Sequence, residues 1–466
     1  MKKFLLASSA LVFSFVAGST SVNAVAFEPF GTPGKNKPAL KVFGQGTFAA
    51  MMFHQKRAEG NNGKGNGSHF TMTDGFLGFQ MLGKADGYGE LEYELLLGLD
   101  PNPDSTNVDT ASALLRGEWG TLMFGNGYGA EYYMSKGPLQ QVIGGIGGAD
   151  GDYTQVVNRT SGTIISMQPI GRTKNGTKIS FYTPRIYGFQ AGFSFTPNSR
   201  HRGEAKLFTN RNARDGAFNA IPFDKNNIAA GMNYVKKFSN GVEIGASAAG
   251  IWANTQQPNG RIAAGAGIDA SSNSPRQRTQ TWLAGIVLGY QHFEAGFEYV
   301  DNGKSHEINS PLYQGSDAGK IYNFGLAYNM GPDKFSLGYS HTKRKLPANA
   351  LLTAANFPVP VGQPAFGAAF TDLGHGKTDV LSASWDRKLA PGLTVFAEGV
   401  YFKYSADQRL GTFMSTNSAG GFGGVLPANS SAGNYYAAQS SGTSNEADTI
   451  GNNQGHVLML GAKLKF

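Results

Sequence analysis

The chain has no cysteine in its 466 residues. Disulfide frameworks, thiolate metal sites and cysteine nucleophiles are therefore excluded. Beyond its N-terminal residues it also lacks any run approaching the roughly 20 consecutive apolar residues of a membrane-spanning helix. Its 8 histidines are scattered without the spacing of metal ligands. No motif indicates catalysis or a cofactor, so the pattern of apolar and polar residues carries the information.

The N-terminus has the pattern of a secretory signal peptide. Lys2 and Lys3 precede an apolar run over residues 4–16, and the small-residue sequence Val22-Asn23-Ala24 follows as a cleavage site. We therefore expect residues 1–24 to be a signal peptide and the mature protein to be exported.

The charge balance is mildly basic. The whole chain has 40 Lys and Arg against 32 Asp and Glu, and loss of the two leader lysines leaves 38 against 32, or +6. No basic helix, stripe or stacking motif accompanies this excess, so nucleic acid is not indicated as a partner. An anionic lipid surface or anionic solutes suit an exported protein better.

Apolar residues recur at every second position over segments of about ten residues, which is the period of a β-strand. One segment places Leu91, Tyr93, Leu95 and Leu97 on one face and Glu90, Glu92 and Glu94 on the other. The mean hydropathy of −0.27 resembles that of a soluble protein. Strands of a membrane barrel also average to mild polarity, because one face meets lipid and the other water. A soluble β-sandwich alternates in the same way, so the lengths of the connections must decide.

Short and long connections alternate along the chain. Sixteen strand-like segments are separated by seven short turns, such as Gly331-Pro332, and eight long polar loops. An even-stranded outer-membrane barrel with both chain ends at its periplasmic rim requires this order. The predicted strands span 40–53, 69–83, 88–100, 109–117, 119–126, 177–184, 187–197, 227–237, 241–253, 279–290, 292–302, 318–330, 333–344, 376–388, 392–406 and 455–466.

The predicted fold is therefore all-β, a transmembrane antiparallel barrel of sixteen strands. Lipid offers no partner to a backbone N–H or C=O, so a sheet crosses a membrane only when it closes on itself. A closed sheet of this many strands is wide enough to leave a water-filled lumen. We expect residues 39–466 to form this barrel and residues 25–38 to be an N-terminal extension.

Several segments resemble the Gram-negative general porins, and the resemblance covers essentially all the strands. The segment from Leu115 to Gly125, LRGEWGTLMFG, resembles the strand–turn–strand before the third loop of that family. Residues 178–184 and the following Tyr187-Gly188-Phe189 resemble the hairpin after this loop, and residues 40–44 resemble the first strand. The terminal Phe466, with apolar residues at every second position before it, resembles the signal that the outer-membrane assembly machinery reads.

The resemblance implies a homotrimer in which the third loop folds into each barrel and narrows its lumen. In this chain the loop spans residues 127–176, and its candidate acids are Glu131, Asp150 and Asp152. In the family such acids face basic residues of the wall. Lys41 and Arg116 are the corresponding wall residues here, because the alternation places both in the lumen.

This chain departs from the basic wall of the family. Gln45, Phe76 and Gln80 stand where a wall Arg or Lys is common. Inward positions of the third strand add negative charge, from Glu90, Glu92 and Glu94. Side chains of one sign inside a narrow pore raise the local concentration of the opposite ion. The three glutamates thus favour a weak cation preference, although the mature chain carries +6.

Two loop sequences leave alternatives open. Gly144-Gly145-Ile146-Gly147-Gly148, within the third loop, either packs its backbone tightly against the wall or serves as a flexible gate. Basic residues between Arg200 and Lys225, in the loop after the seventh strand, either contact lipopolysaccharide phosphates or are solvated.

The pattern predicts an outer-membrane pore that needs no catalysis and no cofactor, and conducts ions and small hydrophilic solutes down their gradients. A substrate-specific channel of the same fold would show saturable conductance and block by its ligand. A structural or adhesin barrel would show no conductance. A barrel enzyme would need a catalytic triad across strand ends, and no motif supports one.

Overall fold

The computed structural model describes residues 39–56, 65–85, 91–100, 107–146, 151–157, 168–173, 176–199, 223–256, 276–307, 309, 316–345, 375–406 and 453–466. The expected signal peptide and N-terminal extension lie outside these residues, so both stay predictions. In the described part of the chain, no helix has the length and apolar character needed to span a bilayer.

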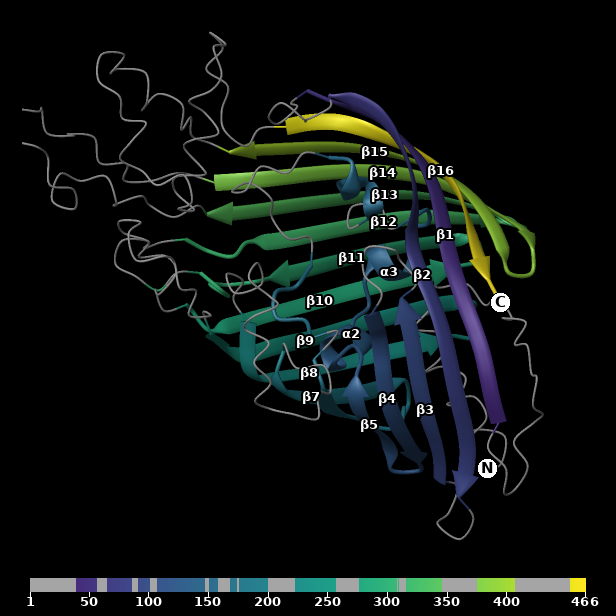
Figure 1. Cartoon of the computed structure of the whole chain (residues 1–466), viewed down its shortest axis with the longest axis vertical. Coiled ribbons are helices and arrows are strands. Elements are labelled where there is room, and N and C mark those ends of the chain that lie inside the picture. Colours follow the sequence, from purple (N-terminus) through teal and green to yellow (C-terminus); the bar gives the residue numbers. More distant parts are fainter. Residues whose placement is uncertain are drawn as a thin grey trace, which may run out of the picture.

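Sixteen β-strands form the described structure (Figure 1). They are β1 (Ala39–Gln55), β2 (Asn66–Ala85), β3 (Leu91–Asp100), β4 (Asn107–Gly117), β5 (Gly120–Asn126), β6 (Lys178–Tyr182), β7 (Phe189–Asn198), β8 (Phe223–Lys237), β9 (Val242–Gln256), β10 (Thr279–Tyr290), β11 (Phe293–Asp301), β12 (Lys320–Met330), β13 (Asp333–Lys345), β14 (His375–Ala390), β15 (Leu393–Ala406) and β16 (Asn453–Lys465).

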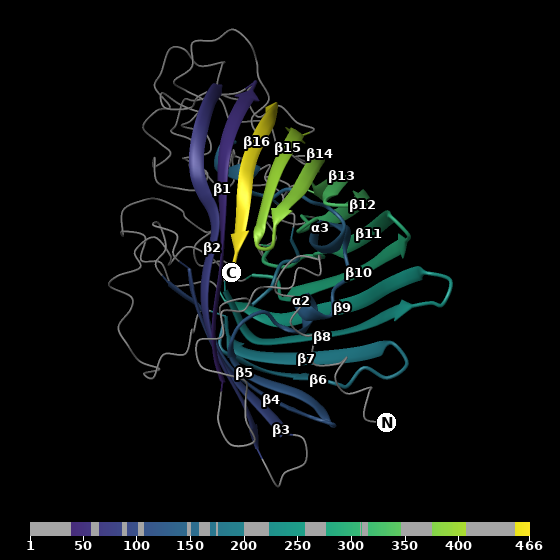
Figure 2. The ribbon, with the colours of Figure 1, turned by 90° about the vertical axis from the view of Figure 1, so that its right-hand side faces the viewer.

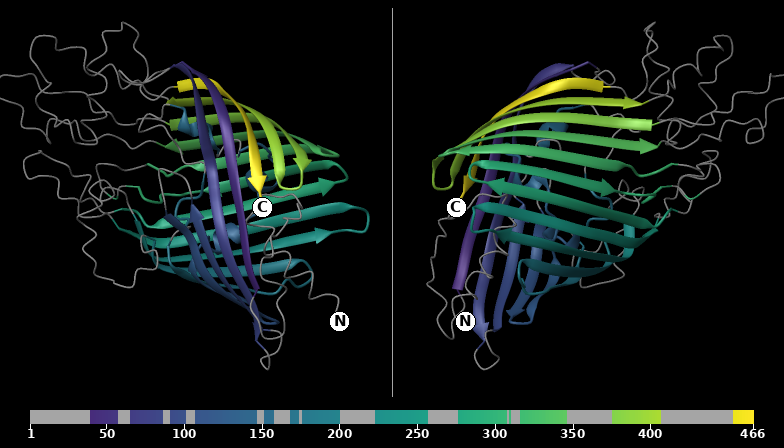
Figure 3. Two further views of the ribbon diagram at one scale, coloured as in Figure 1. Left: turned by 45° about the vertical axis from the view of Figure 1, so that its right-hand side comes forward. Right: turned by 180° about the vertical axis from the view of Figure 1, so that it is seen from behind.

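Each strand pairs antiparallel with its neighbours in sequence, and β1 pairs with β16 to close the barrel. Figure 2 shows β16 between β1 and β15, and the two views of Figure 3 show the strands continuing around both sides. The chain end takes part in this closure, since the backbones of Gly44 and Phe466 exchange two hydrogen bonds of 3.0 Å. Closure leaves no unpaired strand edge, as a sheet surrounded by lipid requires.

The two faces of the wall differ as the alternation predicts. On β13 the side chains of Phe335, Leu337 and Tyr339 are 37–46% exposed on the outer face, whereas Ser336 and Ser340 are buried on the inner face. Successive side chains of a strand point to opposite faces, so this pattern gives an apolar outside and a polar inside. The predicted sixteen-strand barrel is confirmed.

The strand boundaries lie up to four residues from the predicted ones, as at β8, which begins at Phe223 rather than at residue 227, and one predicted short turn is longer than expected. The predicted two-residue turn Arg185-Ile186 is a longer connection between β6 and β7, because β6 ends at Tyr182 and β7 begins at Phe189. Gly188 has a φ of +98°, which favours glycine. The guanidinium of Arg185 donates to the Gly188 carbonyl at 2.6 Å and to Asn233 at 2.8 Å. The backbones of Ile186 and Phe189 also exchange two hydrogen bonds of 2.9 Å, so the charged side chain adds to the backbone bonds of this turn.

Candidate pore constriction

We call the segment between β5 and β6, residues 127–176, the inner loop. Its described residues, 127–146, 151–157, 168–173 and 176, lie inside the barrel. Its described helical turns are α2 (Ala130–Tyr133), α3 (Pro138–Gln141) and the 3-10 turn η2 (Asp152–Gln155). Figures 1 and 2 show α2 and α3 enclosed by the strands, with α2 beside β6 to β9 and α3 beside β10 to β12. The inward-folded third loop that the family resemblance implied is therefore observed.

The root of the inner loop is held by one buried lysine. The ammonium of Lys178, on β6, donates to the carbonyls of Gly127, Thr173 and Gly176, the last two at 2.5 and 2.6 Å. Gly127 begins the loop and Gly176 ends it, so a single side chain joins its two ends. Backbone carbonyls away from water need such partners, because the irregular loop has no ladder to supply them.

Glu131 lies in this root, and its side chain is fully buried. It accepts a hydrogen bond from the amide of Thr173 at 3.5 Å. Desolvation raises its pKa above the ordinary value, an effect that Lys178 and Arg172 oppose through their positive charges. The family resemblance placed Glu131 on the pore side of the loop, but its carboxylate is enclosed by the loop itself, beside Gly129 and the amide of Thr173. A pore-facing role does not fit this position.

Three consecutive amides anchor the middle of the inner loop to three strands. Gly144 donates to Ser336 at 2.8 Å, Gly145 to Asp386 at 2.8 Å, and Ile146 to Glu398 at 2.7 Å. A Cβ at Gly144 or Gly145 would overlap with the carboxylate of Asp386 or Glu398, and Gly145 also has a φ of +65°. For these two glycines, tight packing on the wall is confirmed.

Between root and middle, a further wall carboxylate and a hydroxyl hold the inner loop. The hydroxyl of Ser135 donates to Glu298 at 3.2 Å, and the amide of Lys136 donates to Ser247 at 2.8 Å. Burial, together with the nearby positive charge of Arg185, lowers the pKa of the Lys136 ammonium to about 7. The loop therefore places beside the wall an amine that titrates near neutral pH.

The far part of the inner loop docks through an apolar cluster. Tyr153, on η2, is fully buried, and its hydroxyl lies 3.2 Å from that of Tyr404. The cluster around it consists of inward-facing side chains from four neighbouring strands, Met51, Val380, Phe396, Val400, Phe402, Val457 and Met459. Burial of apolar surface therefore stabilises this end of the loop.

Of the other two acids predicted on the loop, only Asp152 lies within the described residues. Asp152 is half-buried at the start of η2, and its carboxylate accepts a hydrogen bond from Gln155 at 3.3 Å. Asp150 lies outside the described residues. The roles of both at a constriction stay predictions.

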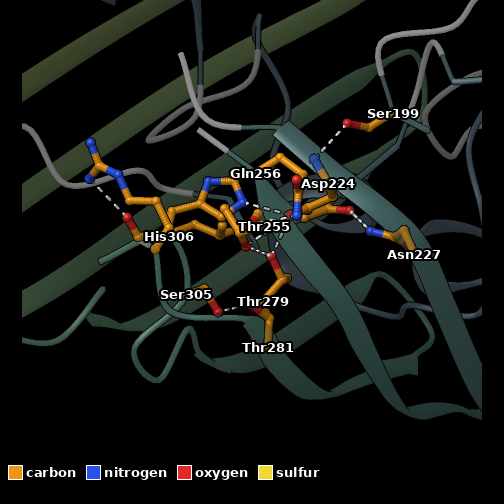
Figure 4. Close-up of polar contacts among 12 residues, drawn as sticks. Ser199, Asp224, Asn227, Thr255, Gln256, Thr279, Thr281, Ser305 and His306 are labelled. Atoms are coloured by element: carbon orange, nitrogen blue, oxygen red, sulfur yellow. Dashed lines mark hydrogen bonds and ion pairs between the residues drawn. The ribbon is translucent and has the colours of Figure 1, made fainter. Parts of the chain in front are cut away.

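A polar network ties the extracellular ends of β8, β9 and β10 to the loop after β11 (Figure 4). The buried carboxylate of Asp224 accepts from Thr255 at 3.1 Å and from Thr279 at 2.8 Å, and lies 3.0 Å from the Nε2 of His306. On the same strand as Asp224, Asn227 donates to the carbonyl of Gly171 at 2.9 Å. The same network thus also holds the returning end of the inner loop.

Of the predicted wall residues, the structure brings Arg116 and Glu94 together. Arg116 forms a 2.7 Å ion pair with Glu94, whose other oxygen accepts from Gln80 at 2.9 Å. Glu92 pairs with Lys84 at 3.0 Å in a more exposed position. Glu94 is close enough to Tyr133 of α2 to contribute to the raised pKa of that phenol, whose main cause is burial. The wall beside α2 is therefore close to charge balance rather than a bare stack of glutamates.

The remaining predicted wall residues lie as follows. Lys41 is partly exposed on β1, and its register partner is Gln80, so both are on the inner face. Gln45, also inward, donates to Asp74 at 2.7 Å. Glu90 lies outside the described residues.

Sequence reasoning missed the residues that anchor the inner loop. Lys178, Glu298, Asp386 and Glu398 all occupy inward positions, but the alternation shows only that a residue faces the lumen and not what it contacts. One signal was present in β15. Its inward residues Phe396, Val400 and Phe402 are as apolar as its outward ones, which is typical of a strand covered on both faces. Within the described ranges, no group of three His, Asp or Glu side chains is placed to hold a metal ion.

A model of the Gram-negative porin family matches residues 7–407 of the chain. The protein therefore belongs to the Gram-negative porins, and it is an outer-membrane β-barrel.

Its curated relatives carry no functional name. The chain is 24% identical over 215 residues to an uncharacterised protein of Rickettsia felis, covering 41% of this chain and 49% of the relative. It is 27% identical over 212 residues to one of Rickettsia bellii, covering 40% and 47%. The chain thus spans about half the length of the curated relatives it matches.

Solved structures share the fold at low sequence identity. The anion-selective porin from Comamonas acidovorans matches with a TM-score of 0.52 and 13% identity, over 92% of this chain and 100% of that one. The outer-membrane channel DcaP of Acinetobacter baumannii matches with a TM-score of 0.50 and 11% identity, over 94% and 99%. At these identities the likeness shows the fold alone.

Proposed function

We propose that the protein is a general porin, which lets ions and small hydrophilic solutes diffuse passively across the outer membrane. The observation that carries this proposal is the inner loop, fixed to the inner wall of a closed barrel from β6 to β15. A loop held at so many points narrows the lumen without needing to move for each solute. Selection then rests on size and on the charge of the lining.

We expect the narrowest part of the proposed pore between α2 and the wall that carries Lys41, Glu92 and the Arg116–Glu94 pair. On the loop side stand Tyr128 and Tyr132, whose rings stack at 3.7 Å, and Arg172, which lies 5.5 Å from the Tyr132 ring. The predicted loop acids Asp150 and Asp152 would add negative charge elsewhere along the loop. A mixed lining of this kind favours at most a weak ion preference, and we retain the expected weak cation preference as part of the proposal.

We further propose that the protein assembles as a homotrimer and reaches the membrane through recognition of the C-terminal Phe466 by the outer-membrane assembly machinery. The first point follows from the resemblance to the general porins, which implies a homotrimer. Supporting the second, the terminal residue is exposed and joins the closing pair of strands. Lipopolysaccharide remains the expected lipid partner, although the basic loop between Arg200 and Lys225 lies largely outside the described residues.

Recording the purified protein in a planar bilayer tests this function. We expect stepwise ohmic openings in groups of three, with conductance proportional to salt and no saturation as sugars, phosphate or dicarboxylates are added. Saturation and block by one solute would instead establish a substrate-specific channel. Absence of any conductance would establish a structural or adhesin barrel.

Reversal potentials in asymmetric salt test the charge assignment. Replacing Asp150 and Asp152 together by Asn should shift the reversal potential toward anion preference if both acids line the pore, and no shift would remove them from it. The double variant Glu94→Gln with Arg116→Gln is the matched neutral change on the wall, and we expect it to alter selectivity little because the pair is already balanced.

A further inference from the structure

Two histidines lie side by side on the pair of strands that closes the barrel. His54 on β1 and His456 on β16 are register partners, and their ring centroids lie 5.2 Å apart with an interplanar angle of 34°. Both side chains are exposed. The two strands belong to opposite ends of the sequence and lie next to each other in Figure 2. Only the folded barrel therefore brings these two imidazoles together.

The pair lies on the outer face, where that face changes from apolar to polar. Met52 and Leu458, two residues nearer the middle of the wall on the same strands, are 48% and 43% exposed on this face. Lys56 and Gln454, two residues toward the rim with the long loops, are also exposed. Water is therefore available beside the imidazoles, as a metal site with open coordination positions requires.

A hydrogen bond on the other side of β1 orients the His54 ring. Its Nδ1 is bonded to the Oδ1 of Asn66, on β2. An amide oxygen only accepts, so Nδ1 carries the proton and Nε2 keeps its lone pair. The two nitrogens of an imidazole point in nearly opposite directions, and β2 and β16 flank β1 on opposite sides. The Nε2 lone pair of His54 is therefore directed toward the strand that carries His456.

The separation of the two rings suits one metal ion between them. Zn²⁺ bonds to an imidazole nitrogen at about 2.0–2.1 Å, so two imidazoles on one tetrahedral ion have ring centroids about 5 Å apart. The observed separation of 5.2 Å matches this arrangement. Histidines that bind a metal almost always donate their other ring N–H to an acceptor, as His54 does to Asn66.

The surroundings favour a transition-metal ion over Mg²⁺ or Ca²⁺. Those hard ions prefer carboxylate and carbonyl oxygens. Within the described residues, the cross-strand neighbours of the pair on its two sides are the amide Asn66 and the phenol Tyr401. His341, elsewhere on the outer face, instead lies 2.8 Å from the carboxylate of Asp379. Two imidazoles without a carboxylate beside them are ligands that suit Zn²⁺ and Cu²⁺.

We propose that His54 and His456 bind one divalent transition-metal ion, Zn²⁺ or Cu²⁺, with water completing its coordination and Asn66 positioning the His54 ring. The ion joins β1 to β16 and cross-links the strand pair that closes the barrel. The unfolded chain does not hold the two imidazoles together, so binding stabilises the closed barrel. The site lies on the outer wall and is independent of the proposed passage of solutes through the lumen.

Calorimetric titration of the intact, detergent-purified protein without a histidine tag tests the site. We expect His54→Gln and His456→Gln each to weaken the binding of Zn²⁺ and Cu²⁺ at least about tenfold, a loss that even an outer-shell partner of a metal site can cause. Because both imidazoles hold the same ion, the double variant should lose scarcely more than either single variant. Electron paramagnetic resonance of the Cu²⁺-loaded parent should show coupling to two imidazole nitrogens, and each single variant should lose one.

Two further variants test the positioning residue. Asn66→Ala removes the acceptor of the His54 Nδ1 and should weaken metal binding about tenfold. Asn66→Asp keeps an oxygen acceptor and should bind at least as tightly as the parent.

The control His292→Gln removes another exposed histidine, at the short turn between β10 and β11. It should bind Zn²⁺ and Cu²⁺ like the parent. Equal affinity of the parent and the double variant, or an equal loss in His292→Gln, would overturn the proposal.

Unfolding in urea gives an independent readout of the cross-link. Zn²⁺ should raise the urea midpoint of the parent progressively with its concentration and leave that of the double variant unchanged, and EDTA should reverse the gain. A parent midpoint that does not respond to Zn²⁺ would refute the cross-link. Unit conductance should be equal in the parent and the double variant, since the site lies outside the lumen, and a difference would contradict that placement.

Discussion

Three carbonyls at the root of the inner loop accept hydrogen bonds from one side chain of the wall, whereas three amides at its middle donate to three side chains of the wall. The root carbonyls of Gly127, Thr173 and Gly176 converge on the ammonium of Lys178. The middle amides of Gly145 and Ile146 point to the carboxylates of Asp386 and Glu398. Root and middle have the same requirement. An irregular backbone inside a barrel has no strand ladder, so side chains must supply the hydrogen-bond partners of its polar groups. The wall does so with a cation in one place and anions in the other.

The comparison also predicts different tolerance to change. At the root, three loop groups depend on one side chain. At the middle, each amide has an acceptor from a different strand, so the loss of one leaves the others in place. The predictions below run from the largest expected effect to the smallest.

Lys178→Met should be the most damaging change, because it leaves three buried carbonyls without their donor. Each unsatisfied buried group costs about 1–3 kcal/mol, so we expect the free energy of unfolding in urea to fall by at least about 3 kcal/mol. The control Lys225→Met alters an exposed lysine and should leave stability unchanged. If Lys178→Met proved as stable as this control, the ammonium would not hold the root.

Gly145→Ala should displace the middle of the inner loop. The new methyl would overlap with the Glu398 carboxylate at a φ of +65°, and left-handed backbone alone costs a non-glycine residue about 1–2 kcal/mol. We expect noisier single-channel currents and a moderate loss of stability. Gly241 has a φ of +85° with open space around it, so Gly241→Ala isolates the backbone cost from the overlap.

Burial of Lys136 should make the stability of the folded protein depend on pH. Its pKa is lowered to about 7 in the folded protein, against about 10.4 for an unperturbed lysine. The unfolded chain therefore binds more protons between these values, and stability rises with pH across this window by at most about 1.4 kcal/mol per pH unit. Below pH 7 the full cost of burying the charge is present. Comparing urea midpoints at pH 6 and pH 9, Lys136→Met should show a smaller difference than the parent.

Glu398→Gln should have the smallest effect, because an amide oxygen can still accept from Ile146. Loss of the charge weakens this hydrogen bond by about 1 kcal/mol, while Ser336 and Asp386 keep the adjacent amides. Glu243→Gln provides a matched change at an exposed inner-wall glutamate that pairs with Lys237. A loss from Glu398→Gln as large as that from Lys178→Met would show that the middle, rather than the root, governs docking.

The alternation of apolar and polar residues was enough to predict the barrel, its sixteen strands and the order of short and long connections. It succeeds because a strand between lipid and water has one face in each, and the polarity of each side chain matches the face on which it lies. The two hairpins around residues 127–176 located the loop that enters the lumen through their resemblance to the general porins. The alternation is a local signal, and the closed sheet follows from it because every backbone group in lipid must be paired.

Which inward residues touch the loop, and which line free space, was decided only by the tertiary structure. Glu131 is fully buried and Glu94 is paired with Arg116, yet in sequence both have the pattern of pore-lining acids. Glu398 lies 252 residues after Ile146 in the sequence. The two meet only because the barrel closes and the inner loop crosses it. Contacts of this range depend on the relative placement of strands far apart in the sequence, and a two-residue period contains no information about that placement.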